Sequence, residues 1–114
     1  MSETPVVWLG SSLEDLRLFP DDARRSVGYQ LGRMQHGLLP TDWKPMMTVG
    51  AGVAEIRVRT RLAHRVFYVA KFAEAIYVLS AFEKRTRKTP PAEIELARRR
   101  LGELLRRRGQ AGTR

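Results

Sequence analysis

The chain has 114 residues with no cysteine and only two histidines, which excludes disulfides, cysteine-ligated metals and histidine-rich metal centres. Its length suits one compact domain, and no apolar run approaches the length of a membrane span. The opening residues lack the basic start and the long apolar core of a signal peptide, so we expect a cytoplasmic protein.

The net charge is +9, and the excess of positive charge lies in the second half of the chain. Residues 1–54 contain 5 Lys/Arg and 6 Asp/Glu, whereas residues 55–114 contain 16 and 6. An asymmetry of this kind indicates one basic face and a polyanionic partner. Nucleic acid is the first candidate, an acidic protein the second and an anionic membrane the third.

The first half of the chain predicts one strand, two helices and a loop. Residues 5–10 (PVVWLG) are a short β-rich run that ends at a glycine. Residues 11–19 favour a helix, and Pro20 breaks or bends it. Residues 22–36 predict a second helix, because apolar side chains recur along one stripe: Ala23, Val27, Leu31, Met34 and Leu38. Residues 38–52 contain prolines and glycines without a clear period, which is typical of a loop.

The second half predicts a sheet followed by a helix. Short gaps separate three strand candidates, which should form an antiparallel meander: 53–61, 65–72 and 75–82. Residues 92–109 place apolar side chains at helical spacing, and we expect the tail from about 109 to 114 to be frayed. The order is therefore β-α-α-β-β-β-α, one α+β domain over residues 1–114 in which an antiparallel sheet packs against helices on one side.

Alternation along the predicted strands separates apolar from basic residues. On the first strand, one face carries Ala54, Ile56 and Val58, and the other carries Glu55, Arg57, Arg59 and Arg61. If the apolar side packs on the helices, the outer face carries Arg57 and Arg59, with Arg65 or Lys71 beside them. The basic turn at 84–88 leaves the third strand near one edge of that face.

This basic face has two interpretations. Each arginine alone can be part of a solvated strand surface. Several arginines on one face without matching acids repel one another, however, and a bound phosphate backbone relieves that repulsion. For the face as a whole we favour phosphate binding.

Other residues have a structural interpretation. We expect His64, next to Arg65, to be an exposed residue in a turn. We expect His36 to lie at the end of a helix. We expect Tyr68 in the core.

Residues 54–101 resemble the HigB-like, phage-derived branch of the RelE/ParE toxin superfamily. The resemblance rests on three motifs in order: Glu55-Ile56-Arg57, then His64-Arg65-Val66-Phe67-Tyr68, then LSAFEKRTRKTP from Leu79 to Pro90. Two positions depart from the usual pattern, where Ser80 replaces a histidine and Arg85 replaces a lysine. Arginine keeps the charge but does not act as an acid at neutral pH, so the identity of the general acid is open.

The resemblance implies a RelE-like fold and a type II toxin–antitoxin toxin. Such toxins are small basic ribonucleases that cut mRNA in the ribosomal A site, and their partner here would be a HigA-like helix-turn-helix antitoxin. Two alternatives stay open: a non-catalytic toxin of the same fold that inhibits DNA gyrase, and a basic RNA- or ribosome-binding module. The arginine and lysine cluster favours the nuclease over the gyrase inhibitor.

We expect neither a metal nor a cofactor. Metal-free RNA cleavage needs a base for the 2′-OH, positive charge at the transition state and an acid for the leaving 5′-oxygen. The candidate catalytic residues are Arg57 and Arg65 for charge, Lys84 for the leaving or a flanking phosphate, Lys71 as donor or base, and Glu55 as a base or as the partner that orders Arg57. The candidate RNA-binding residues are Arg59, Arg61, His64, Arg85, Arg87 and Lys88.

Overall fold

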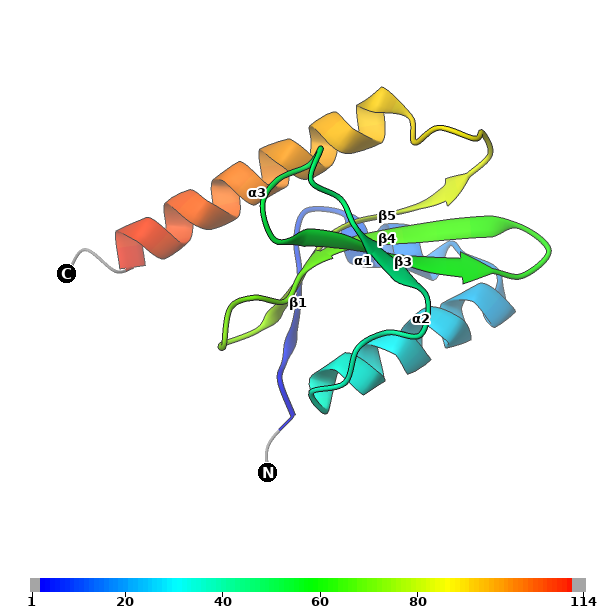
Figure 1. Cartoon of the computed structure of the whole chain (residues 1–114), viewed down its shortest axis with the longest axis horizontal. Helices are drawn as coiled ribbons and strands as arrows, with labels where there is room; N and C mark the ends of the chain where they lie inside the picture. Colours follow the sequence, from blue (N-terminus) through cyan, green and yellow to red (C-terminus); the bar gives the residue numbers. More distant parts are fainter. Residues whose placement is uncertain (1–2, 112–114) are drawn as a thin grey trace.

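The computed structural model describes residues 3–111, and its α+β class is the expected one (Figure 1). The elements in chain order are β1 (Val6–Trp8), α1 (Ser12–Arg17), α2 (Asp21–Gln35), β2 (Trp43–Pro45), β3 (Val53–Arg59), β4 (Ala63–Val69), β5 (Ile76–Lys84) and α3 (Pro91–Ala111). No helix among these residues is both long and apolar enough to cross a bilayer.

The strands form one sheet in the order β1-β5-β4-β3-β2. The antiparallel meander of β3, β4 and β5 is confirmed. The sheet is mixed rather than antiparallel throughout, because β1 pairs with β5 in parallel. No tight turn joins these two strands, because α1, α2, β2, β3 and β4 lie between them in the chain, and a long connection of this kind permits parallel pairing.

The loop expected over residues 38–52 contains a strand, β2, at the edge of the sheet. Pro45 has no N–H to donate, which an edge strand tolerates. A pair of hydrogen bonds holds the chain before β2 against α2: the Gln30 side-chain amide donates to Thr41 Oγ1 and accepts from the Thr41 N–H, both over 2.7 Å. This attachment fixes the position of Lys44 on β2, opposite Glu55 on β3.

Two apolar clusters lie on opposite faces of the sheet. One face packs against α1 and α2, and its cluster includes Val27, Leu31, Ile56, Val66 and Tyr68. Tyr68 is therefore in the core, as expected, and burial raises its pKa to about 12.

The other face packs against α3, so the prediction that the helices lie on one side was wrong (Figure 1). The apolar stripe of α3 needs an apolar surface, and the outer face of the sheet provides one beside its arginines. Its cluster includes Phe67, Val69, Leu79, Ala97 and Leu101. The helix covers only part of this face, and the remainder carries the basic residues.

The C-terminal part of α3 is attached to the β4–β5 turn through one arginine. Arg108 donates two hydrogen bonds to the Glu74 carboxylate, of 2.7 and 3.1 Å, and lies over the Phe72 ring. The hydroxyl of Tyr77 donates to the same carboxylate over 2.8 Å. The first part of the tail that was expected to fray is thus helical up to Ala111, and residues 112–114 lie outside the described residues.

Neutralising Glu74 should loosen the end of α3. The Arg108 hydrogen bonds, followed by the one from Tyr77, lower the pKa of Glu74 to about 2. Because this pKa is lower in the folded protein, the attachment is complete above about pH 4.5 and is lost as the pH falls toward 2. Glu74→Gln should therefore speed amide hydrogen exchange at Arg106 and Arg107 near neutral pH. Glu95→Gln, which removes an exposed ion pair with Arg98 on the same helix, is the matched control and should leave those amides unchanged.

Candidate nucleic-acid interface

Sheet pairing brings together basic residues from three strands on the part of the face that α3 leaves uncovered. Arg57 on β3 lies directly opposite Arg65 on β4. Lys84, the last residue of β5, pairs with Ala63 at the start of β4. The predicted pairing of these arginine-bearing strands is therefore present.

These residues line an open hollow of about 590 Å³. Its lining consists of five cationic side chains with one threonine and one alanine: Arg57, Arg59, Arg65, Lys84, Arg87, Thr86 and Ala63. No carboxylate belongs to this lining. A surface with this composition attracts phosphate, and guanidinium groups can bind it through two hydrogen bonds at once.

A buried carboxylate lies beneath the hollow and faces its arginines. Glu55 is fully buried. Its Oε1 is 3.6 Å from Arg65 Nε, 3.9 Å from Arg57 Nε and 3.8 Å from Lys44 Nζ. Neither Glu55 oxygen has a hydrogen-bond partner among the described residues. One negative charge thus opposes three positive ones, which holds the two facing arginines together despite their repulsion.

The charges in the hollow differ in their access to solvent. The Arg65 side chain is 6% exposed and that of Arg57 is 28% exposed. Burial lowers the pKa of Arg65, and Glu55 opposes that shift. Burial, followed by repulsion from Arg65, also lowers the pKa of Lys84. Lys84 therefore gives up a proton more readily than a fully solvated lysine.

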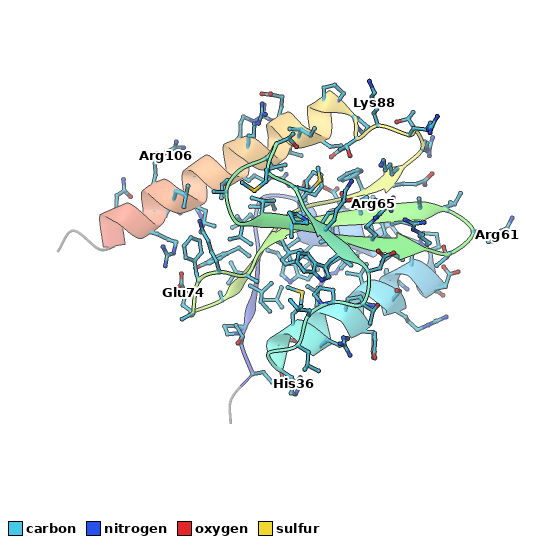
Figure 2. The ribbon with its side chains drawn as sticks, viewed as in Figure 1. His36, Arg61, Arg65, Glu74, Lys88 and Arg106 are labelled. Atoms are coloured by element: carbon cyan, nitrogen blue, oxygen red, sulfur yellow. The ribbon has the colours of Figure 1, made fainter. Side chains whose placement is uncertain are left out.

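Several predicted site residues lie elsewhere. Lys71 follows the opposite end of β4, where its Nζ donates to the Ala51 carbonyl over 3.3 Å. Arg61 lies at the tip of the β3–β4 hairpin, and Lys88 lies near the start of α3 (Figure 2). Arg85 is exposed beside the hollow and donates to Glu83 over 2.9 Å. Of the remaining RNA-binding candidates, Arg59 and Arg87 line the hollow.

The expectation that His64 is an exposed turn residue was wrong. It belongs to β4, is 1% exposed and packs against Phe19 with the two rings tilted and 4.2 Å between their centroids. Since neighbouring residues of a strand point to opposite faces, His64 lies on the face away from the hollow that Arg65 lines. The other histidine, His36, lies at the end of α2, as expected.

The sequence did not point to Lys44 or Thr86 as members of this site. Lys44 reaches Glu55 only because β2 exists, and a three-residue strand containing proline has no alternation to reveal it. Thr86 lies in the basic turn, where its Oγ1 donates to the Lys88 carbonyl over 2.7 Å. That bond keeps the turn folded beside the hollow.

The sequence matches the family described as phage-derived protein Gp49-like (DUF891) over residues 14–102. The chain belongs to this family. The match covers all three motifs noted in the sequence and every residue that lines the hollow. A comparison of this Gp49-like chain with curated proteins found no match.

The Gp49-like family is associated with RelE- and HigB-type toxins. Membership therefore indicates a phage-derived toxin of a toxin–antitoxin system, and it implies an antitoxin partner. The sheet with its flanking helices is compatible with a RelE-like fold.

Proposed function

We propose that this Gp49-like protein is a ribosome-dependent mRNA endonuclease that inhibits translation in the cytoplasm. In this proposal it is the toxin of a type II pair, and its antitoxin is a HigA-like helix-turn-helix protein. The observation that carries the proposal is the hollow lined by five cations and no carboxylate, in a member of a toxin-associated family. A groove of that charge fits the phosphate backbone of RNA.

The proposed reaction is attack of a ribose 2′-oxygen on the adjacent phosphorus. The new P–O2′ bond forms, the P–O5′ bond breaks, and the products are a 2′,3′-cyclic phosphate and a 5′-hydroxyl. Negative charge builds up on the phosphate oxygens in between. Arg57 and Arg65 face each other across β3 and β4, so both can donate to those oxygens.

Lys84 is the proposed proton donor to the leaving 5′-oxygen. It lines the same hollow, and its lowered pKa eases the transfer. Glu55 is proposed as a positioning residue rather than the base, because it is fully buried beneath the arginines. Among the described residues that line the hollow, none is a carboxylate or a histidine that could take the 2′-OH proton. In this proposal a group of the ribosome accepts the 2′-OH proton while Lys84 protonates the 5′-oxygen, so the reaction depends on the ribosome.

The role of Lys84 predicts a decline of activity at alkaline pH. A donor must be protonated, so the cleavage rate should fall as the pH rises through the pKa of Lys84, which lies below its ordinary value. In Lys84→Arg the side chain stays protonated, so the protein should cleave more slowly and show no such decline. The measurement is the RNA cleavage rate of the unchanged protein and of Lys84→Arg across an alkaline pH series. An identical decline in both would assign the titration to another group.

Expression without an antitoxin tests the proposed activity in cells. Mapping of mRNA 5′ ends after induction should reveal cuts inside translated regions, in phase with codons. Growth arrest with intact mRNA and damaged DNA would replace this proposal with gyrase inhibition. Normal growth with intact mRNA would instead favour a plain RNA- or ribosome-binding module.

A further inference from the structure

One edge of β5 is open along its C-terminal half. On that side β1 pairs only with Ile76–Val78. The next residue, Leu79, has its carbonyl paired, because Arg100 Nη1 donates a hydrogen bond to it over 2.7 Å. No described strand pairs with residues 81–84 on the side away from β4. Every second residue of a strand directs its N–H and C=O groups away from the neighbouring strand. On the side away from β4, residues 81–84 therefore present N–H and C=O groups that no described strand pairs.

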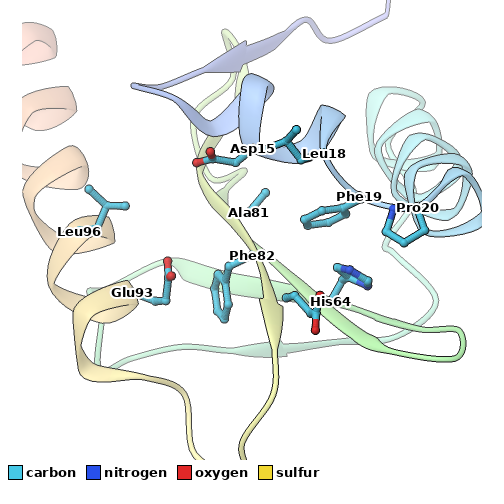
Figure 3. A pocket seen from close by; sticks show the side chains of 10 residues that line it. Asp15, Leu18, Phe19, Pro20, His64, Ala81, Phe82, Glu93 and Leu96 are labelled. Carbon is cyan, nitrogen blue, oxygen red and sulfur yellow. The ribbon is translucent and has the colours of Figure 1, made fainter.

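A groove of about 330 Å³ lies along this open edge, between α1 and the first turns of α3 (Figure 3). Its floor is formed by Ala81, Phe82 and Glu83 of β5. Leu18 after α1 and Leu96 of α3 add apolar walls, and Leu18 is 83% exposed. The groove therefore combines a strand edge with an apolar lining, which is the arrangement that binds an added strand.

The charge of this groove is opposite to that of the hollow. Asp15 and Glu93 face the space between α1 and α3 (Figure 3), and neither makes an ion pair among the described residues. Burial, followed by repulsion from Asp15, raises the pKa of Glu93. The third carboxylate, Glu83, is paired with Arg85. A protein of net charge +9 thus has a site where two carboxylates lie close together outside any ion pair among the described residues, although the charge of Arg100 partly offsets the rise in the pKa of Glu93.

His64 provides an independent indication of a ligand. It lines the inner wall of the groove and is 1% exposed, and its Nδ1 has no hydrogen-bond partner among the described residues. Buried ring nitrogens are normally paired, because an unpaired polar atom away from water is destabilising. Because Nδ1 is itself closed to solvent, a ligand that enters the groove from the open edge supplies the missing partner after the ring turns toward that edge.

We propose that this groove binds an extended basic segment of a partner protein, which adds a strand to the open edge of β5. Its backbone pairs with residues 81–84, one apolar side chain lies against Leu18 and Leu96, and an arginine or lysine reaches Asp15 and Glu93. RNA is excluded as the occupant because those carboxylates repel phosphate. The groove lies across β5 from the cationic hollow, so the partner does not compete with RNA for the same groups.

A peptide titration tests this proposal: a short capped peptide of alternating valine and arginine is added to the isotope-labelled 114-residue chain. At about 0.15 M salt, amide shifts should concentrate at Ala81, Phe82 and Glu83. The double variant Asp15→Asn/Glu93→Gln should bind the peptide about tenfold more weakly. The control Glu95→Gln also removes a carboxylate from α3, outside the groove, and should bind like the unchanged protein.

Two further peptides decide between strand addition and general charge attraction. A valine–arginine peptide that is N-methylated at alternate residues keeps its charge but cannot pair along that edge, so it should not bind. A valine–glutamate peptide should not bind either. The proposal is overturned if the first peptide produces no shifts at about 1 mM, if its shifts map to another surface, or if the N-methylated peptide binds equally well. Concentration-dependent shifts at residues 81–84 without peptide would overturn it in favour of pairing between two copies of the chain.

Discussion

Replacing Arg65 with alanine is expected to lower the rate of ribosome-dependent mRNA cleavage by about 100-fold to 1,000-fold. Arg65 is the least exposed cation of the hollow, and it lies directly opposite Arg57. Removing a fixed donor aimed at the developing charge on phosphate raises the barrier without changing the rest of the surface. The cleavage rate at saturating ribosome concentration measures the effect.

Two variants separate lost chemistry from lost charge or lost fold. Arg65→Lys keeps the charge but not the planar pair of donors, so it should recover only part of the rate. Arg61→Ala removes an arginine at the hairpin tip, outside the hollow, and should cleave at nearly the normal rate. If Arg65→Ala is folded, by circular dichroism, and cleaves as fast as Arg61→Ala, the hollow is not the catalytic site.

Replacing Glu55 with glutamine is expected to lower the free energy of unfolding by about 2 to 3 kcal/mol. The change is nearly isosteric, but it leaves the charges of Arg57, Arg65 and Lys44 without their shared counter-charge. This loss is smaller than the roughly 3 to 5 kcal/mol that is usual for a broken buried ion pair, because the side chains of Arg57 and Lys44 are partly exposed to water. Urea unfolding at pH 7 measures the loss.

A double variant shows whether charge imbalance is the cause. Glu55→Gln/Arg57→Gln removes one of the repelling cations, so it should be more stable than the sum of the two single changes predicts. Glu95→Gln removes an exposed ion pair and should change stability by less than about 0.5 kcal/mol. Unfolding curves of Glu55→Gln that coincide with those of the unchanged protein would contradict the assigned role of Glu55.

Local patterns in the sequence predicted the meander and an outer sheet face that carries arginines. Alternation over residues 53–61 separated Ile56 and Val58 from Arg57 and Arg59, and the short gaps between strands determined the antiparallel pairing. The stripe on α2 also predicted the burial of its apolar residues, except that Leu38 lies beyond the end of the helix and is 53% exposed. These features depend on neighbours in the chain, so the periods of helix and strand reveal them.

The remaining features depend on contacts between distant segments. β2 is a strand only because β3 and α2 hold it, through pairing and through Gln30. His64 looked exposed because it adjoins a turn, yet Phe19 covers it. The position of α3 was misjudged because the stripe of a helix shows that it packs, but not on which face of the sheet. Phe67 and Val69 lie on the same face of the sheet as Arg65, and these two apolar residues indicated that this face also packs against a helix.

Cleavage of a defined mRNA on purified ribosomes tests the central claim most directly. The protein is added to ribosomes that hold one known codon in the A site, and the new RNA ends are mapped. We predict cuts within that codon only when ribosomes are present, with a 5′-hydroxyl on the downstream fragment, and no cuts with Arg57→Ala/Arg65→Ala. Intact mRNA, or equal cleavage by that folded double variant, would contradict the assignment of the arginine-lined hollow as a ribonuclease site.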